Sequence, residues 1–232
     1  MLPILLTRPA GKNEALMAAI DPAVRQYLRP IYSPLIEIIP TGAQVVLQGF
    51  DAVIFTSAYG VRFAPKGRGK AAYCVGDETA KAASDAGWAA KVAGQNAAQL
   101  IRQLAQDAPQ RRLLHLSGVH TRGDIARSLS RLGTTTVNQA VYDQKLVDLT
   151  TEAAQILVRE NHVLVPLFSS RTAAQFAKHS IGKSTIDVIA LSAAVSEPLA
   201  NLSLGGLTIA DEPDKRSMVR AIEKLVQNIA LG

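Results

Sequence analysis

The chain has 232 residues, of which 48% are hydrophobic and 19% are charged, so it can bury a sizeable core and intrinsic disorder is excluded. The longest stretches without a charged residue, 38–50 and 198–210, have 13 residues each, whereas a membrane-spanning helix needs about 20 apolar ones. Lys and Arg number 25 against 19 Asp and Glu, and the resulting net charge of +6 favours a polyanionic partner.

The short apolar runs of the sequence alternate with helical patterns along the whole chain. This alternation is typical of parallel sheets that are covered by helices on both faces. Helical spacing of apolar residues marks 96–106 and the C-terminal segment from Met218 to Ile229, and Gly87 and Gly133 follow two further helical stretches at positions where helices commonly stop. The predicted strands, in chain order, are 4–7, 51–56, 71–75, 112–116, 162–168 and 187–191.

The two halves of the sequence show a weak internal duplication. Pro30-Ile31-Tyr32 and Ala140-Val141-Tyr142 lie 110 residues apart, and Phe55-Thr56-Ser57 and Phe168-Ser169-Ser170 lie 113 apart. A repeat of this kind predicts two similar α/β lobes with parallel sheets flanked by helices. Two extended segments, 34–48 and 139–146, are the expected linker strands between the lobes, and a cleft is expected where the lobes meet.

Polar residues gather at the carboxyl ends of the predicted strands. In a doubly wound sheet, ligands bind at that edge, where helices begin with unpaired backbone N–H groups. Several such positions together predict a site for a polycarboxylate, although each Ser or Thr taken alone could merely cap the next helix. The residues concerned are Thr7, Arg8, Thr56, Ser57, Gly76, Ser117, Gly118, Ser169, Ser170 and Ser192.

The single cysteine and the four histidines give little sign of a metal site. Cys74 cannot form an internal disulfide, which agrees with a reducing compartment and excludes a cysteine-based metal cluster. The histidines show no i,i+4 pair, and His115 within a strand is better explained as a buried core histidine than as a ligand. We expect no metal. The N-terminal segment lacks the basic start of a secretory signal, which predicts a cytoplasmic protein with no membrane contact.

The familiar nucleotide and esterase motifs are also missing from the sequence. It contains neither a Gly-x-x-x-x-Gly-Lys loop nor a Gly-x-Gly-x-x-Gly turn, and no Gly-x-Ser-x-Gly elbow. Nucleotide hydrolysis, dinucleotide chemistry and serine esterase chemistry therefore lose support.

A series of short blocks in this order and spacing resembles the uroporphyrinogen-III synthase family. The resemblance covers essentially the whole chain, and it thins in the second half, where Phe168-Ser169-Ser170 follows Pro166 within a strand and Val195-Ser196 stands in the place of Thr79-Ala80. The blocks are LTRP at 6–9, PLIEIIP at 34–40, DAVIFTSAYGV at 51–61, VGDETA at 75–80 and AVY at 140–142.

The resemblance implies two α/β lobes joined by two linker strands. Carried onto this sequence, residues 1–33 and 147–232 form the first, discontinuous lobe and residues 49–138 form the second. The implied enzyme is a lyase without a cofactor. It cyclises the linear tetrapyrrole hydroxymethylbilane, with inversion of ring D and loss of water, to uroporphyrinogen III in haem biosynthesis.

The resemblance also implies roles for individual residues. Tyr142 matches the tyrosine of the family and is the expected proton donor or water-orienting group, although a buried tyrosine could equally pack the linker strand. Thr79 joins the strand-end residues as an expected substrate-binding residue. The expected partner is the polycarboxylate substrate, with no nucleic acid and no membrane, and the expected state is a monomer.

Two other classes stay open on the sequence alone. A two-lobed cytosolic binding or sensor protein for an anionic metabolite would share the lobes and the strand-end sites. A nucleic-acid-binding module would use the basic charge, but the sequence carries no recognisable motif for it.

Overall fold

The computed structural model describes all residues except 108–109, 122, 180–181, 183 and 232. The chain divides into two compact units, and it passes between them twice. Unit 1 comprises residues 1–37 and 145–232, and unit 2 comprises residues 38–144, so both divisions fall within the segments expected to be linker strands. Each unit is an α/β structure with a mainly parallel sheet, which confirms the predicted fold class.

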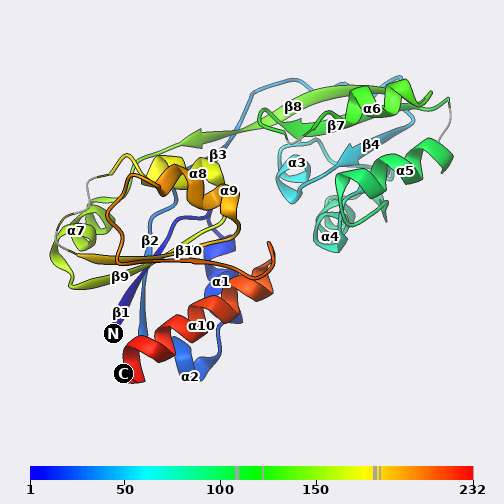
Figure 1. Cartoon of the computed structure of the whole chain (residues 1–232). Coiled ribbons are helices and arrows are strands. Elements are labelled where there is room, and N and C mark those ends of the chain that lie inside the picture. The colour runs from blue at the N-terminus through cyan, green and yellow to red at the C-terminus, as the bar shows by residue number, and fades with distance from the viewer. Residues whose placement is uncertain (108–109, 122, 180–181, 183, 232) are drawn as a thin grey trace. The chain divides into compact units, whose positions relative to one another are not determined.

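The sheet of unit 1 has the order β11-β10-β9-β1-β2 among the described residues (Figure 1). All four strand pairs are parallel. Pro30 lies in the edge strand β2. No described strand pairs with the outer side of β2, so the missing N–H of the proline costs no hydrogen bond on that side. The strands are β1 (Leu2–Leu6), β2 (Leu28–Tyr32), β9 (His162–Leu167), β10 (Thr185–Ala190) and β11 (Gly206–Ile209).

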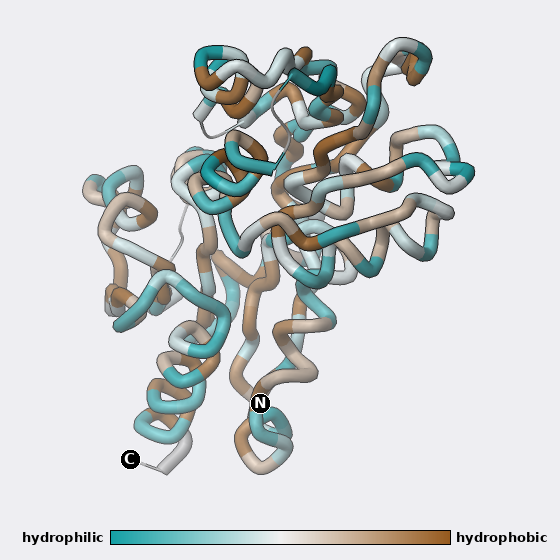
Figure 2. Tube along the Cα trace, turned by 90° about the vertical axis from the view of Figure 1, so that its right-hand side faces the viewer, coloured by the Kyte–Doolittle hydropathy of each residue, from teal (hydrophilic) through white to brown (hydrophobic). Residues whose placement is uncertain are grey.

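Helices cover both faces of this sheet. Successive residues of β1 point to opposite faces of the sheet, so that Leu5 packs with α7, α8 and α9 while Ile4 and Leu6 pack with α1, α2 and α10. Figure 2 shows brown and teal sides on α10, as its amphipathic pattern requires. The helices are α1 (Lys12–Ala19), α2 (Pro22–Arg25), α7 (Thr151–Arg159), α8 (Ser170–Phe176), α9 (Ala193–Ser196), η1 (Glu197–Leu199) and α10 (Lys215–Leu231).

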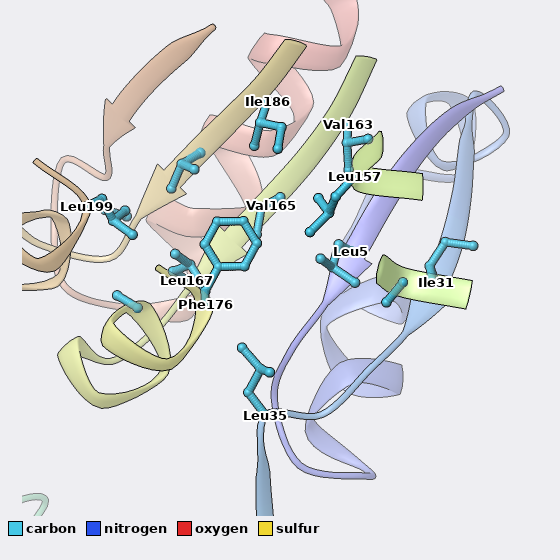
Figure 3. Packing of buried hydrophobic residues seen from close by; sticks show 14 of the residues in the cluster. Leu5, Ile31, Leu35, Leu157, Val163, Val165, Leu167, Phe176, Ile186 and Leu199 are labelled. Carbon is cyan, nitrogen blue, oxygen red and sulfur yellow. The ribbon is translucent and has the colours of Figure 1, made fainter. Parts of the chain in front are cut away.

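Phe176 is the largest side chain in the core under α8. Figure 3 shows its ring lying among Val165, Leu167 and their neighbours on β9 and β10, and the ring is 1% exposed. Burying an aromatic ring of this size contributes about 2–3 kcal/mol relative to leaving it in water. This core fixes α8 against the carboxyl end of β9, which sets the position of Ser169 and Ser170.

The sheet of unit 2 has the order β3-β8-β7-β4-β5-β6 among the described residues. The four pairs from β8 to β6 are parallel, with a bulge in β8, where Val141 is the extra residue opposite Ser117 and Gly118 of β7. The strands are β3 (Ile36–Pro40), β4 (Ala52–Phe55), β5 (Ala71–Cys74), β6 (Ala89–Val92), β7 (Arg112–Gly118) and β8 (Thr135–Leu146).

The helices of unit 2 also lie on both faces of their sheet. Phe55, Leu116 and Trp88 belong to the core on the side of α3 and α4, while Ile54 and Leu113 belong to the core on the side of α5 and α6. The glycines predicted to stop two helices do so after α4 and α6, with φ of +83° at Gly87 and +90° at Gly133. The helices are α3 (Ala58–Arg62), α4 (Asp77–Asp85), α5 (Ala97–Asp107) and α6 (Ile125–Arg131).

The expected extended segments take part in strands β3 and β8. The N–H of Thr41 donates to the carbonyl of Val141 and the N–H of Val147 donates to the carbonyl of Leu35. Because one residue number rises as the other falls, β3 and β8 run antiparallel. Residues 139–146 are the second part of the 12-residue strand β8, which also pairs with β7.

Strands β2, β6 and β11, at the edges of the sheets, are absent from the predicted runs. Edge strands have a solvent-exposed side, so they carry fewer apolar residues than central ones. Ala89–Val92 alternates between exposed and half-buried residues, and three of the four residues of β11 are exposed. The hydrophobic signal therefore found every central strand except β8, whose second part was expected only as a linker strand, and it missed these three edge strands.

The internal repeat is real, but its register differs from the sequence alignment. Ser57 is the N-cap of α3 and Ser169 is the N-cap of α8, so the equivalent of Ser57 is Ser169 and not Ser170. Tyr32 and Tyr142 are not equivalent either. Ile4 pairs with Leu164 and Leu113 pairs with Ala52, and each of these partners lies five positions before the cap serine of its unit. Ile4 is therefore equivalent to Leu113, and Leu6 is equivalent to His115. Leu6 pairs with Tyr32 and His115 pairs with Asn138, so Tyr32 and Asn138 are the equivalent residues.

No helix within the described ranges is long and apolar enough to cross a membrane.

Candidate active site

A pocket of about 370 Å³ lies in unit 2 at the carboxyl ends of its parallel strands. The residues that follow β4, the end of β7, the loop after β7 and the second part of β8 form its walls. This is the edge at which doubly wound sheets bind ligands. The lining residues are Thr56, Ser57, Tyr59, Val75, Ala97, His115, Gly118, His120, Thr121, Gly123, Ile125, Tyr142 and Gln144.

Tyr142 of β8 presents its phenol to this pocket. Its ring stacks on Phe63, with ring centres 6.3 Å apart, and it also contacts Tyr59, with ring centres 5.9 Å apart. The residue is 6% exposed. Burial raises the pKa of the Tyr142 phenol above its ordinary value, and the hydrogen bond with the Ser57 side chain opposes this rise. The phenol therefore keeps its proton at neutral pH.

Gly118 makes room for the Tyr142 ring. Its strand partner in β8 is Tyr142, and a Cβ atom at Gly118 would lie 2.7 Å from two ring carbons and 3.0 Å from the hydroxyl oxygen. A Cβ atom cannot fit this close to the ring in the packed structure, so any other residue at position 118 would displace the ring. The role of Gly118 at this edge is thus steric.

Ser57 joins α3 to Tyr142. Its hydroxyl oxygen accepts a hydrogen bond from the N–H of Tyr59 at 3.2 Å, as an N-cap residue does, and the same side chain is the partner of the Tyr142 phenol. A capping hydroxyl still has its own proton to donate. The capping explanation is therefore correct for Ser57, and it leaves the residue able to take part in binding.

Thr56 and His115 meet on the other side of the same strand end. The Thr56 Oγ1 and His115 Nε2 atoms are 3.4 Å apart. His115 is 3% exposed, and burial lowers its pKa to about 4, although the charge of Asp124 and a hydrogen bond with the Asn138 side chain act in the opposite direction. The imidazole is neutral at physiological pH. The sequence explanation of His115 as a core histidine is correct as to burial, but it missed the contact with the pocket.

The loop after β7 adds residues that sequence reasoning did not find. His120 Nε2 lies 3.4 Å from Asp143 Oδ1, and both side chains are more than one third exposed. Thr121, Ile125 and Gln144 complete this wall. The available signal was positional: these residues follow Ser117-Gly118 or flank Tyr142 directly in the sequence.

The other predicted residues of unit 2 lie beside the pocket rather than in its lining. The Ser117 hydroxyl donates to the Gly118 carbonyl and is 1% exposed. Gly76, at φ +73°, precedes α4, and its N–H donates to the carbonyl of Gly94. Thr79 is buried on α4.

The predicted residues of unit 1 lie at the carboxyl end of its own sheet. Thr7 is 1% exposed, and its hydroxyl has no hydrogen-bond partner among the described residues. The Arg8 guanidinium lies 4.0 Å from the centre of the Phe168 ring. Ser169 caps α8 and contacts the Thr172 hydroxyl.

Ser170 and Ser192 differ in how their hydroxyls are used. The Ser170 hydroxyl donates to the Ala194 carbonyl at 2.7 Å, which ties α8 to α9. Ser192 precedes α9, and within the part of the chain that the structure describes its side chain makes no capping hydrogen bond. Ser192 therefore has a hydroxyl that helix capping does not use.

Two doubly wound units, with a protonated tyrosine and several hydroxyls in a strand-end pocket, define a two-domain α/β enzyme. The family model described as uroporphyrinogen-III synthase HemD matches residues 20–220. The chain belongs to the uroporphyrinogen-III synthase family. It is a cyclising lyase of tetrapyrrole biosynthesis, which converts hydroxymethylbilane to uroporphyrinogen III with inversion of ring D and loss of water.

A solved structure with a TM-score above 0.5 agrees on the fold. Uroporphyrinogen-III synthetase from Helicobacter pylori is 18% identical, with a TM-score of 0.66, and the match covers 97% of this chain and 99% of that one. Uroporphyrinogen III synthase from the extremely thermophilic bacterium Thermus thermophilus, in its native form, is 14% identical with a TM-score of 0.41, covering 99% and 100%. A comparison with curated proteins gave no match. The family match assigns the enzyme and gives no support to the alternative of a sensor protein.

Proposed function

We propose that the pocket of unit 2 is the catalytic part of the site, with Tyr142 as proton donor or water-orienting group. The observation that supports this most directly is the Tyr142 phenol, which is buried, protonated and hydrogen-bonded to Ser57 at the pocket wall. A proton is needed at one point in the reaction. The hydroxyl of the substrate leaves as water, so its oxygen must gain a proton as the C–O bond breaks.

The remaining chemistry belongs to the substrate. The electrons of the breaking C–O bond go to the oxygen, which leaves a cationic azafulvene stabilised by its own pyrrole nitrogen. The substituted carbon of ring D attacks this cation to form a spiro intermediate, which fragments and recloses at the other carbon of that ring. That carbon then loses its hydrogen as a proton, which restores the aromatic pyrrole and balances the proton given to the leaving water. The protein contributes mainly by holding a flexible molecule in the reactive shape.

We propose that hydroxyls at the strand ends bind the carboxylates of hydroxymethylbilane. Thr56 and Ser57 line the pocket of unit 2 and can each donate one hydrogen bond. In unit 1 the candidates are Thr7, Arg8, Ser169, Ser170 and Ser192. The Arg8 side chain is held by its contact with Phe168, and the buried Thr7 hydroxyl has no hydrogen-bond partner within the part of the chain that the structure describes. The net charge of +6 attracts the polyanion before it binds.

We further propose that the protein works as a monomer in the cytoplasm. The lining residues of the pocket all belong to unit 2. The thiol of Cys74 is buried and burial raises its pKa to about 12, so it suits a reducing compartment and takes no part in chemistry. Sedimentation of the enzyme with and without substrate tests the monomer, and a dimer that forms at working concentration would contradict it.

The experiment that tests the role of Tyr142 compares two Tyr→Phe substitutions. Tyr142→Phe removes the pocket hydroxyl and keeps the ring packing, whereas Tyr73→Phe removes a hydroxyl on β5 that accepts a hydrogen bond from Arg111 outside the pocket. We expect Tyr142→Phe to lose about 10- to 100-fold in kcat, in the range of one general acid, and Tyr73→Phe to keep the rate of the unmodified enzyme. Equal rates for the two variants would refute the proposal.

A further inference from the structure

His115 lies in a row of polar side chains that crosses the sheet of unit 2 just below the pocket. In the strand register His115 is paired with Ile54 of β4 and with Asn138 of β8, and Thr56 follows Ile54 by two residues on the same face. The imidazole thus has Asn138 on one side as a hydrogen-bond partner and Thr56 on the other at 3.4 Å. Of this row, Thr56 and His115 line the pocket.

The fold itself does not require a histidine at this position. Unit 1 has the same strand order, and its equivalent residue is Leu6, which is fully buried in an apolar core. Around His115 the core also contains leucine and isoleucine, among them Leu113 and Ile125. A buried imidazole costs desolvation that a leucine avoids. The polar side chain at position 115 therefore calls for an explanation other than packing.

We propose that His115 is a positioning residue that directs the Thr56 hydroxyl toward a substrate carboxylate. The imidazole donates from Nε2 to Thr56 Oγ1, and the Thr56 proton then points to the carboxylate in the pocket. In the reverse arrangement Thr56 would spend its proton on the ring, and its oxygen would present only lone pairs to an anion. The proposal rests on the binding role proposed above for Thr56.

The surroundings of His115 allow this arrangement. With the proton of the neutral ring on Nε2, Nδ1 accepts a hydrogen bond from the NH2 group of the Asn138 amide. When the ring is charged, rotation of the amide lets its oxygen accept from Nδ1–H, and this is the interaction that raises the pKa of His115. The 3.4 Å distance is at the long end of hydrogen bonding, and such contacts commonly tighten when the substrate is bound. The ring is neutral near pH 7, so it orients Thr56 without adding a fixed charge that would hold the anionic product. Asp124, at the start of α6, is the charged group that acts on the ring.

The test is a double-substitution cycle measured with hydroxymethylbilane as substrate. Thr56→Val removes the hydroxyl, His115→Leu removes the donor, and His115→Gln keeps an N–H at nearly the position of Nε2. We expect Thr56→Val and His115→Leu each to raise KM by about 3- to 10-fold with little change in kcat, the scale of one hydrogen bond. His115→Gln should stay within about twofold of the unmodified enzyme. The double variant should have the KM of Thr56→Val alone.

The outcomes distinguish this inference from the proposed binding role of Thr56 on which it rests. An unchanged KM in Thr56→Val would end the binding role of Thr56, and the inference with it. A second outcome is that Thr56→Val raises KM and that adding His115→Leu raises KM further, by the factor that His115→Leu shows alone. In that case Thr56 binds substrate and His115 does not act through it. Should His115→Leu fail to fold, His115→Asn takes its place. Its amide is too short to reach Thr56, so a KM equal to that of the unmodified enzyme would overturn the inference.

Discussion

The two units of this enzyme share an architecture but differ in the residues at their strand ends. Both sheets have the same strand order from β11 to β2 and from β6 to β8, and in both a serine after the central strand caps the next helix. Unit 1 has Leu6 where unit 2 has His115, and Tyr32 where unit 2 has Asn138. The repeated fold therefore tolerates an apolar residue at the position of His115, and only His115 of these two polar residues lines the pocket, since Asn138 is exposed.

Strand β8 accounts for the largest difference. It runs for 12 residues, and a bulge within it at Val141 places Tyr142 opposite Gly118 of β7, four residues beyond the equivalent of Tyr32. Strand β2 has 5 residues and ends at Tyr32, which is 44% exposed. The longer strand carries a tyrosine into a buried position that unit 1 does not have. The comparison thus links the catalytic proposal to one local extension of a repeated fold.

The largest expected effect concerns stability against pH. His115 has a pKa of about 4 in the folded protein and 6.5 when unfolded, so the unfolded chain binds more protons between these values. Stability should fall as the pH drops from 6.5 to 4, by about 3 kcal/mol at 1.36 kcal/mol per pKa unit. His115→Leu, which copies unit 1, should remove this part of the dependence. Urea unfolding at several pH values measures it, and parallel curves for the two proteins would contradict the burial argument.

Replacing one tightly packed glycine by alanine in each unit compares the effect of overpacking near the pocket with its effect elsewhere. Gly118→Ala brings a Cβ within 2.7 Å of the Tyr142 ring, and Gly205→Ala in unit 1 brings one within 2.3 Å of the Thr185 side chain. Both should cost about 1–3 kcal/mol of stability through overpacking. Only Gly118→Ala should also lower kcat, by about 10-fold or more, because it moves the phenol. Similar rates in the two variants would mean that the placement of the ring is unimportant.

The equivalent caps should give the smallest effect. Ser57→Ala and Ser169→Ala each remove a side chain that accepts a helix N–H, so each should lose about 1 kcal/mol of stability. Ser57→Ala should in addition raise the pKa of Tyr142, because its hydrogen bond holds that pKa down. Ultraviolet titration of the tyrosines detects this shift. The absence of any change in Ser57→Ala would contradict the contact between the two hydroxyls.

Much of this fold could be predicted from the sequence because central strands carry a clear apolar signal. The alternation of runs and helices indicated parallel sheets, and the glycines after α4 and α6 marked helix ends correctly. Edge strands such as β11 escaped because most of their residues face solvent. The repeat was recognised, but matching residue types aligned Ser57 with Ser170, whereas the positions of the helix N-caps align Ser57 with Ser169.

The site was predictable only in part. Thr56, Ser57, Gly118 and Tyr142, which line the pocket, were singled out in the sequence because they end strands or match a family block, and their binding and catalytic roles stay proposals. The position of His115 at the pocket wall was hidden, because a histidine in an apolar strand looks the same in the sequence whether or not its ring reaches a pocket. Its contact with Thr56 depends on strand pairing between residues 59 positions apart, which no local pattern reveals.

The measurement that tests the central claim most directly is the rate and isomer of the product made by Tyr142→Phe and by Tyr32→Phe. Hydroxymethylbilane closes without enzyme to the uninverted isomer, so isomer identity reports on how the substrate is held and rate reports on proton transfer. The account predicts that Tyr142→Phe is slowed about 10- to 100-fold, still makes mainly uroporphyrinogen III, and changes stability by less than about 1.5 kcal/mol, while Tyr32→Phe keeps the full rate. A fast Tyr142→Phe, or an equal loss in Tyr32→Phe, would contradict it.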